Sequence, residues 1–284
     1  MPHIKTLTVL GTGVLGSQIA FQAAFHGFAV TAYDIDDAAL DKARARFAHL
    51  AGIYRAQVTG ASEGQAEAAL DKLSLSADLG AAVADADLVI EAVPELLELK
   101  RDMYRKLADL APARTIFATN SSTLLPSDLK DSTGRPDRFL AIHYANNIWA
   151  QNIAEVMGTA ETDPAVFDAV VEFARNSGLE PIEIKKEKAG YVLNSLLVPL
   201  LNAAAGLLLQ GVASPETIDK TWRIATGAPS GPFQIFDVVG LGTAYNISAS
   251  SPDAGSRAFA QYLKENYIDQ GKLGVATGEG FYTY

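Results

Sequence analysis

The sequence contains no cysteine, which excludes disulfide bonds, thiolate metal ligands and a cysteine nucleophile. This absence fits a reducing compartment. The opening residues 1–5 also lead directly into a strand-like pattern, with no signal-peptide features. We therefore expect a cytoplasmic protein, and no metal ion is expected in it.

Positive charge and long hydrophobic runs are scarce as well. The formal net charge is −10 and no run of Lys or Arg occurs, whereas a nucleic-acid partner would require a concentrated basic patch. The most apolar stretch, 196–209, is interrupted by Pro199 and Asn202 and is shorter than the about 20 residues of a membrane span. We interpret this stretch as a buried helix, and expect neither a nucleic-acid nor a membrane partner.

Short apolar runs alternate with helical patterns through the first two thirds of the chain. The strand-like runs are 7–10, 29–33, 88–92, 115–118, 139–143 and 153–157. The main helical patterns are 14–26, 36–56, 96–110 and 164–176. Such alternation is typical of βαβ units. It predicts an α/β protein with an N-terminal Rossmann-type doubly wound sheet.

A glycine-rich loop follows the first predicted strand. The residues Gly11-Thr12-Gly13-Val14-Leu15-Gly16 form a GxGxxG motif that opens a helix, and Asp34 follows the next strand. In this context the glycines allow a tight turn and close approach of a pyrophosphate, while the acidic residue binds the adenosine ribose and repels a 2′-phosphate. The motif predicts NAD(H) binding by Gly11, Gly13, Val14, Leu15, Gly16 and Asp34. The alternative is a plain turn with a solvent-facing Asp34.

The character of the sequence changes near residue 187. There the charged cluster Lys185-Lys186-Glu187-Lys188 passes into an apolar helical segment, 191–210. We therefore expect an NAD-binding domain over residues 1–187 and a smaller all-α domain for substrate binding and dimerisation over 188–284. Such a small apolar helical portion would not bury its own surface easily, so we expect a homodimer through it.

His143 is the best candidate for proton chemistry among the four histidines. It ends a strand pattern, and ligands of doubly wound sheets bind outside the carboxyl ends of strands. A dehydrogenase needs a group that exchanges a proton with the substrate oxygen, and histidine titrates near neutral pH. A structural histidine is the alternative from position alone, as it is for His3, His26 and His49.

Further stretches carry a resemblance. They are Glu91-Ala92-Val93-Pro94-Glu95, Thr119-Asn120-Ser121-Ser122-Thr123-Leu124, His143 with Glu155, Gly190-Tyr191-Val192-Leu193-Asn194 and Gly278-Glu279-Gly280-Phe281-Tyr282. In this order, over nearly the whole chain, the sequence resembles the 3-hydroxyacyl-CoA dehydrogenase family. Around His143 and Trp149 it is most similar to the family's bacterial reductases of diketo esters.

The resemblance implies a role for each matching residue. His143 would be the general acid/base and Glu155 would orient its ring. An amide or hydroxyl can donate to an oxygen that gains negative charge, which suits Ser122 and Asn194 as substrate-binding residues. The resemblance places the nicotinamide-ribose end of the cofactor along Glu95, Lys100, Asn120 and Ser122.

Some of these residues have alternative interpretations. Ser122 also fits a helix N-cap, and Lys100 fits a solvated helix face. Asn194 in an apolar helix and Glu155 between apolar neighbours are harder to explain structurally, because a buried polar group without partners costs about 1–3 kcal/mol.

The segment after His143 departs from the family pattern His-Phe-Phe-Asn-Pro. It reads His143-Tyr144-Ala145-Asn146-Asn147 and then Ile148-Trp149. Because this segment borders the substrate in the family, acyl-CoA specificity is in doubt although the chemistry is retained. We expect Asn146, Trp149 and Trp222 to line the substrate pocket. Packing at domain contacts is the alternative for the two tryptophans.

Together these observations predict an NADH-dependent reductase or dehydrogenase that interconverts 3-keto and 3-hydroxy groups, preferably in β-keto and β,δ-diketo esters. The alternatives are a 3-hydroxyacyl-CoA (3-hydroxybutyryl-CoA) dehydrogenase, a sugar-acid 3-dehydrogenase and a crystallin-type structural relative. Retention of Ser122, His143, Glu155 and Asn194 argues against the structural relative, because a scaffold needs none of them.

Overall fold

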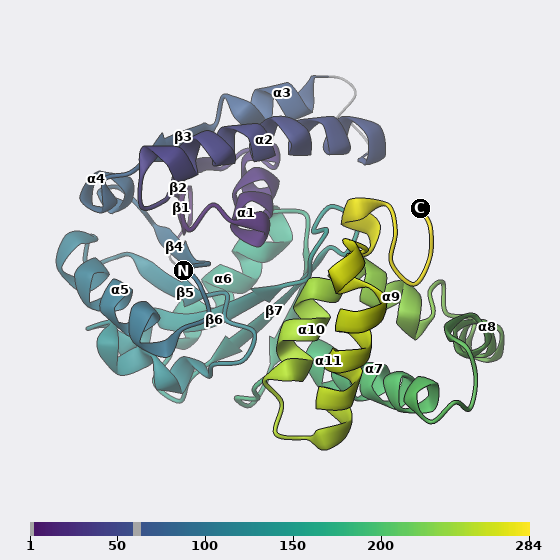
Figure 1. Ribbon diagram of the computed structural model, residues 1–284. Helices are drawn as coiled ribbons and strands as arrows, with labels where there is room; N and C mark the ends of the chain where they lie inside the picture. Colours follow the sequence, from purple (N-terminus) through teal and green to yellow (C-terminus); the bar gives the residue numbers. More distant parts are fainter. Residues whose placement is uncertain (1–2, 59–63) are drawn as a thin grey trace. The chain divides into compact units, whose positions relative to one another are not determined.

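An eight-stranded sheet is the frame of the first part of the chain in the computed structural model, which describes residues 3–58 and 64–284 (Figure 1). The strands are β1 (Thr6–Leu10), β2 (Ala29–Tyr33), β3 (Leu73–Ser76), β4 (Leu88–Glu91), β5 (Ile116–Thr119), β6 (Phe139–Tyr144), β7 (Ile153–Gly158) and β8 (Glu180–Ile184). Their order is β3-β2-β1-β4-β5-β6-β7-β8. Neighbouring strands are parallel except β6 and β7. This order confirms the predicted doubly wound α/β fold.

Helices connect and cover the strands. In the first part they are α1 (Val14–Phe25), α2 (Asp37–Gln57), α3 (Gln65–Leu70), α4 (Leu79–Val83), α5 (Leu97–Leu110) and α6 (Pro164–Asn176). Those that follow are α7 (Leu193–Leu209), α8 (Pro215–Thr226), α9 (Pro232–Val239), α10 (Leu241–Ala249) and α11 (Ala254–Asn266). Short 3-10 turns are η2 (Pro126–Asp128), η3 (Lys130–Ser132), η4 (Pro136–Arg138), η5 (Ile268–Gln270) and η6 (Val275–Thr277). Met1 and Pro2, which contributed to the signal-peptide expectation, lie outside the described residues.

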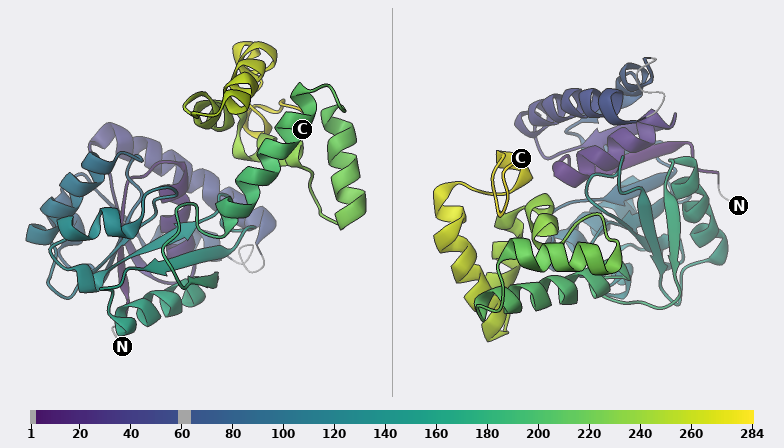
Figure 2. Two further views of the ribbon diagram at one scale, coloured as in Figure 1. Left: turned by 90° about the horizontal axis from the view of Figure 1, so that it is seen from below. Right: turned by 90° about the vertical axis from the view of Figure 1, so that its right-hand side faces the viewer.

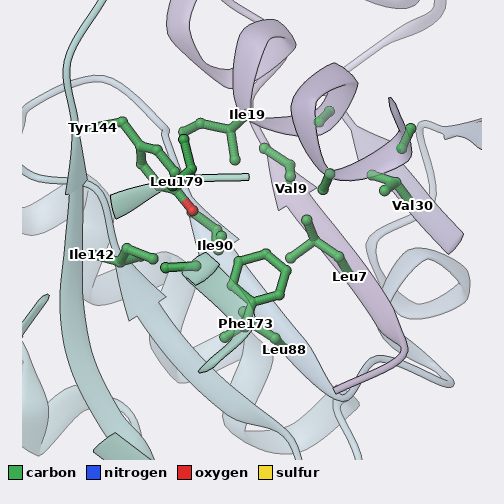
Figure 3. Packing of buried hydrophobic residues seen from close by; sticks show 14 of the residues in the cluster. Leu7, Val9, Ile19, Val30, Leu88, Ile90, Ile142, Tyr144, Phe173 and Leu179 are labelled. Carbon is green, nitrogen blue, oxygen red and sulfur yellow. The ribbon is translucent and has the colours of Figure 1, made fainter. Parts of the chain in front are cut away.

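Apolar side chains from the strands and the covering helices pack against each other on both faces of the sheet. Successive residues of a strand point to opposite faces, so Val9 packs in a large cluster with α1, α2 and α6, whereas Leu10 packs in a second cluster with α4 and α5. Figure 3 shows part of the large cluster, in which Ile19 of α1 and Tyr144 of β6 project into the same interior. This packing on two faces fixes the strand ends from which the candidate site is built.

The chain divides into two compact units, Met1–Val192 and Leu193–Tyr284. The change in sequence character near residue 187 falls shortly before this division. The second unit consists of α7 to α11 with short 3-10 turns, which Figure 2 shows in green and yellow. Its own buried cluster includes Phe233, Phe236 and Leu263.

A buried aspartate fastens the end of the second unit. Asp237 is 1% exposed and accepts hydrogen bonds from the backbone N–H groups of Phe281 and Tyr282, both at 2.9 Å. The Tyr284 hydroxyl donates to the same carboxylate at 3.0 Å. A Cβ at Gly280 would collide with the Asp237 side chain. Gly280 and the residues that follow it in the terminal motif therefore anchor the end of the chain to Asp237 of α9.

The expectation of a buried helix over 196–209 is wrong for much of α7. Leu196 is 70% exposed and Leu207 is 41% exposed, whereas Leu201 and Ala204 are buried. The helix packs against α9 and α11, which cover only part of its circumference. Among the described helices, none has the length and apolar character needed to cross a membrane.

Candidate active site

Four loops lie at one edge of the sheet, where the central parallel strands have their carboxyl ends. The glycine loop follows β1, residues 92–96 follow β4, residues 120–125 follow β5 and residues 145–152 follow β6. Because β7 is antiparallel to β6, its first residues return to the same edge, where Glu155 pairs with His143 in register. Ligands of such sheets bind at this edge, near the point where the strand order reverses.

The loop between β1 and α1 has the shape that a dinucleotide requires. Gly11 has a φ of +93°, and a Cβ there would lie 2.7 Å from the carbonyl oxygen of Ala92. A Cβ at Gly16 would collide with the Gly11 carbonyl oxygen. By contrast, a Cβ at Gly13 would meet no described atom within 4 Å, so a ligand can approach the backbone closely there. No described side chain caps the N-terminus of α1, which leaves its N–H groups to an anion.

Asp34 is held against this loop. Its Oδ2 accepts hydrogen bonds from the Thr12 backbone N–H at 2.8 Å and the Thr12 hydroxyl at 2.5 Å. The pKa of Asp34 is lowered overall. Partial burial alone would raise it, but the hydrogen bonds from Thr12 and Ile35 and the positive charge of Arg46 have the larger combined effect. Arg46 also donates to the Thr12 carbonyl oxygen at 3.1 Å. The glycine motif specifies neither Thr12 nor Arg46, so neither was expected near the cofactor.

The imidazole of His143 lies between two polar partners. Its Nδ1 is 3.0 Å from Glu155 Oε2, and its Nε2 is 3.2 Å from the Ser122 hydroxyl. A carboxylate only accepts, so Nδ1 carries the proton toward Glu155. Glu155 is itself held by the Val192 backbone N–H, which donates to Oε1 at 2.9 Å. His143 is 4% exposed and Glu155 is 1% exposed. The structure therefore brings Ser122, His143 and Glu155 together.

Tyr191 packs flat against this histidine. The two ring centroids are 4.6 Å apart and the planes differ by 13°. The Tyr191 hydroxyl donates to the Ser121 carbonyl oxygen at 2.9 Å. Burial, with the nearby Glu155 carboxylate, raises the pKa of Tyr191, so the hydroxyl remains a donor. Tyr191 was not among the predicted site residues, although it lies in the stretch 190–194 that carries the family resemblance.

Glu95 holds the loop that carries Ser122. Its Oε1 accepts from the backbone N–H groups of Ser122 and Thr123 at 3.1 and 3.0 Å, and from the Thr123 hydroxyl at 2.8 Å. The Ser121 hydroxyl donates to the same oxygen. Burial raises the pKa of Glu95, but these bonds and the Lys100 charge dominate and lower it to about 2. Ser122 is therefore positioned by the Glu95 carboxylate, and it is not the N-cap of the following 3-10 turn, which begins after Leu125.

Lys100 connects Glu95 to a second carboxylate beneath the site. Its ammonium lies 2.5 Å from Glu91 Oε1, 3.1 Å from the Val93 carbonyl oxygen and 3.2 Å from Glu95 Oε2. Lys100 is 1% exposed and Glu91 is fully buried, which excludes the solvated-helix interpretation of Lys100. Burial raises the pKa of Glu91, and the Lys100 charge opposes this shift. The ammonium donates hydrogen bonds to Glu91 and to the Val93 carbonyl oxygen and forms an ion pair with Glu95, and a cofactor contact by Lys100 stays a prediction.

The remaining predicted residues of the first unit lie close to this edge. Asn120 accepts from the Tyr144 backbone N–H at 3.2 Å through its side-chain oxygen, next to His143. Asn146 is exposed in the loop after β6. Trp149 is partly buried, and its indole N–H donates to the Gln57 side chain at 2.8 Å.

Asn194 and Trp222 belong to the second unit. Asn194 is the second residue of α7 and is partly buried. Trp222 is partly buried on α8. Their roles toward substrate stay predictions.

Two family models together match nearly the whole chain. Residues 6–188 match the NAD-binding domain of 3-hydroxyacyl-CoA dehydrogenase, and residues 190–284 match its C-terminal domain. The mitochondrial hydroxyacyl-coenzyme A dehydrogenase of Rattus norvegicus is 35% identical over 99% of this chain and 91% of its own length. The probable 3-hydroxybutyryl-CoA dehydrogenase of Bacillus subtilis is 32% identical, over 99% and 98%.

The chain is also similar to solved structures of dehydrogenases and reductases. A structure described as substrate-directed dual catalysis of dicarbonyl compounds by diketoreductase is 69% identical, has a TM-score of 0.95 and covers both chains completely. The (S)-3-hydroxybutyryl-CoA dehydrogenase of Ralstonia eutropha is 28% identical, with a TM-score of 0.81 over 99% of each chain.

The fold, the glycine loop and these matches define an NAD-dependent oxidoreductase that acts on CH–OH groups. The chain belongs to the 3-hydroxyacyl-CoA dehydrogenase family. Its cofactor is NAD(H), and its substrate is a small molecule.

Proposed function

We propose that the protein is an NADH-dependent reductase of 3-keto groups, and the reverse dehydrogenase, with His143 as general acid/base. The observation that carries this proposal is the His143 imidazole held between Glu155 and Ser122 at the cofactor edge of the sheet. Bound NADH supplies the hydride. Because the Nδ1–H group donates its hydrogen bond to Glu155, Nε2 is the nitrogen that exchanges a proton with the substrate oxygen.

The other polar side chains stabilise the reacting oxygen. During reduction, His143 gives its Nε2 proton to the 3-keto oxygen while the Ser122 hydroxyl donates a hydrogen bond to it. Asn194 is proposed as a further donor to the same oxygen. These bonds strengthen as the oxygen gains negative charge, which lowers the barrier. Glu155 stabilises the protonated imidazole before the transfer and fixes the ring afterwards.

We propose the cofactor contacts from the local geometry. Asp34 binds the adenosine ribose and repels the 2′-phosphate of NADPH. The open backbone around Gly13 and the N–H groups of Val14, Leu15 and Gly16 receive the pyrophosphate. Glu95, Lys100, Asn120 and Ser122 lie toward the nicotinamide ribose. We propose that Asn120 contacts the cofactor through its amide nitrogen, because its side-chain oxygen already accepts from the Tyr144 N–H.

We propose β-keto and β,δ-diketo esters as the preferred substrates, with Asn146, Trp149 and Trp222 lining the pocket. Support comes from the altered segment after His143 and from the name of the 69%-identical solved structure. The second candidate is 3-hydroxyacyl-CoA dehydrogenase activity, which the names of the rat and Bacillus relatives favour.

One assay separates these candidates. NADH oxidation is measured with a diketo ester, a simple β-keto ester, acetoacetyl-CoA and an oxidised sugar acid. We expect the highest kcat/KM with the diketo ester. A preference for acetoacetyl-CoA by orders of magnitude would overturn the substrate class. NADH binding without turnover of any of them would favour a structural relative.

A pair of histidine variants tests the mechanism. His143→Ala should retain NADH affinity and lose about 10²–10⁴-fold in kcat, the usual contribution of a general acid. His49→Ala is the matched control, because His49 is an exposed residue of α2. Unchanged turnover in His143→Ala would remove His143 from the proton transfer.

We also propose a cytoplasmic homodimer that associates through the second unit. Exposed apolar side chains of α7, such as Leu196 and Leu207, support this contact. Light scattering of the purified protein should give twice the chain mass, and Leu196→Glu should lower it. A monomer at micromolar concentration would contradict the proposal.

A further inference from the structure

Gln18 is a buried polar residue that neither the cofactor motif nor the proton chemistry uses. It lies on α1, just beyond the glycine loop, and is 6% exposed. Its side-chain oxygen accepts from the backbone N–H groups of Asn147 and Ile148, at 2.9 and 3.3 Å. Both partners are donors, so the carbonyl oxygen must face them. Gln18 thus joins the cofactor helix to the segment that follows His143.

That segment, residues 145–151, is called the substrate loop below. Asn147 has a φ of +59°, in the left-handed region. Its carbonyl oxygen accepts from the N–H groups of Ala150 and Gln151, both at 2.8 Å, which closes a turn. Proline, the residue of the family pattern at this position, has a φ fixed near −65° and no N–H. The loop therefore follows a path that proline does not permit, and it has gained a donor that needs an acceptor.

The rest of the loop is anchored to the same layer of helices. Ile148 is fully buried in the large apolar cluster that contains α1. The Trp149 indole N–H donates a hydrogen bond to the side chain of Gln57, the last residue of α2. The loop starts one residue after β6, the strand that carries His143. These contacts connect α1 and α2 to the backbone next to His143.

We propose that Gln18 is a positioning residue that fixes the substrate loop and couples it to cofactor binding on α1. Phosphates at the N-terminus of α1 restrain that helix, and the Gln18 bonds pass the restraint to Asn147 and Ile148. The substrate loop is then held more firmly when NADH is bound than in the free protein. The identity of the substrate rests on the proposed function, whereas the coupling does not.

Hydrogen exchange tests the coupling without turnover. In the wild-type protein, NADH should slow amide exchange over residues 145–151. Gln18→Met has similar size and no acceptor, so exchange there should be about tenfold faster in the free protein. NADH should then protect the loop much less. Equal protection by NADH in wild type and variant would overturn the coupling.

Kinetics provide the second readout. Gln18→Met should raise KM for the keto substrate about tenfold with little change in kcat, since the loop shapes the substrate site. It should also weaken NADH binding, because coupling between the loop and the cofactor site is reciprocal. Gln261→Met, an exposed change on α11, is the matched control. An unchanged KM would overturn the positioning role. If wild type reduces no keto ester, the proposed function fails, and the exchange experiment still decides the coupling.

A second pair of variants covers poor folding of Gln18→Met. Asn147→Gly keeps the left-handed turn and should behave as wild type. Asn147→Pro cannot adopt the turn and cannot donate to Gln18, so it should raise KM and loop exchange as Gln18→Met does. Wild-type values for Asn147→Pro would contradict the proposal.

Discussion

Tyr191 lies stacked on His143, with the ring planes 13° apart, and its own backbone has a φ of +51°. A tyrosine in this left-handed conformation costs about 1–3 kcal/mol, so the surrounding contacts must fix it. The bond from its hydroxyl to the Ser121 carbonyl oxygen is one of these contacts. Through this bond the aromatic ring connects the histidine to the loop that carries Ser122.

Variants of Tyr191 should separate the ring from the hydroxyl. Tyr191→Phe keeps the stacked ring and should lower kcat less than about tenfold. Tyr191→Leu removes the aromatic face that stabilises a protonated imidazole, an interaction of about 0.5–2 kcal/mol, and should lower kcat further. The measurement is kcat at saturating NADH, with urea unfolding to confirm the fold. Wild-type turnover in Tyr191→Leu would show that the stack does not assist proton transfer.

Asp34 should decide the choice between NADH and NADPH. Asp34→Ala removes the proposed acceptor for the ribose hydroxyls and the negative charge that is proposed to repel a 2′-phosphate. We expect kcat/KM for NADH to fall about 10–100-fold, the effect of losing a charged hydrogen bond, and the value for NADPH to rise. Asp41→Ala, an exposed change on α2, serves as control. A constant preference for NADH in Asp34→Ala would contradict the assignment.

Lys100 should be more important for stability than its position on a helix implies. Lys100→Met leaves the carboxylate of Glu91 buried without its cation, which typically costs about 3–5 kcal/mol in the free energy of unfolding. The double variant Lys100→Met/Glu91→Gln removes the unpaired charge and should recover part of this loss. Urea unfolding measures both. Lys106→Met is the control, because Lys106 is exposed on α5. A double variant no more stable than Lys100→Met would argue against the charge explanation.

Glu95 should make stability depend on pH in the acid range. Its pKa is about 2 in the folded protein and 4.5 in the unfolded reference. Folding therefore favours the ionised form, and the resulting stabilisation is complete above about pH 4.5 and is lost as the pH falls toward 2. Glu95→Gln should be less stable than wild type at pH 7, and the difference should shrink below pH 4.5. Urea unfolding from pH 7 to pH 3 measures this, and a difference that stays constant would exclude the carboxylate as its source.

Much of the first unit was predictable from local pattern. The strand at 29–33 and the helix at 164–176 have the expected bounds, and the GxGxxG motif opens α1 as predicted. These features depend on side-chain periodicity and turn chemistry, which neighbouring residues determine. β3 was missed because its Leu-Ser-Leu-Ser pattern is short and half polar. α9 and α10 were missed because both are short and only Gly240 separates them.

The candidate site depended more on contacts between distant residues. His143 was recognisable at the end of its strand, but the antiparallel register of β6 and β7 places Glu155 beside it. The sequence pattern around Lys100 also fits a solvent-exposed helix lysine, whereas the packing of α5 buries Lys100 against Glu91. Gln18 had no distinguishing signal, because its partners are backbone N–H groups 129 and 130 residues away.

The sequence alone thus determined that this protein binds NAD(H) through an N-terminal βαβ unit, because a phosphate-binding turn requires particular residues at short spacing. The tertiary structure alone decided how the site is held: which carboxylate pairs with His143, which cation pairs with Glu91 and Glu95, and which side chain accepts hydrogen bonds from the loop after His143. Those outcomes follow from strand register and burial, which arise when segments far apart in the chain pack together.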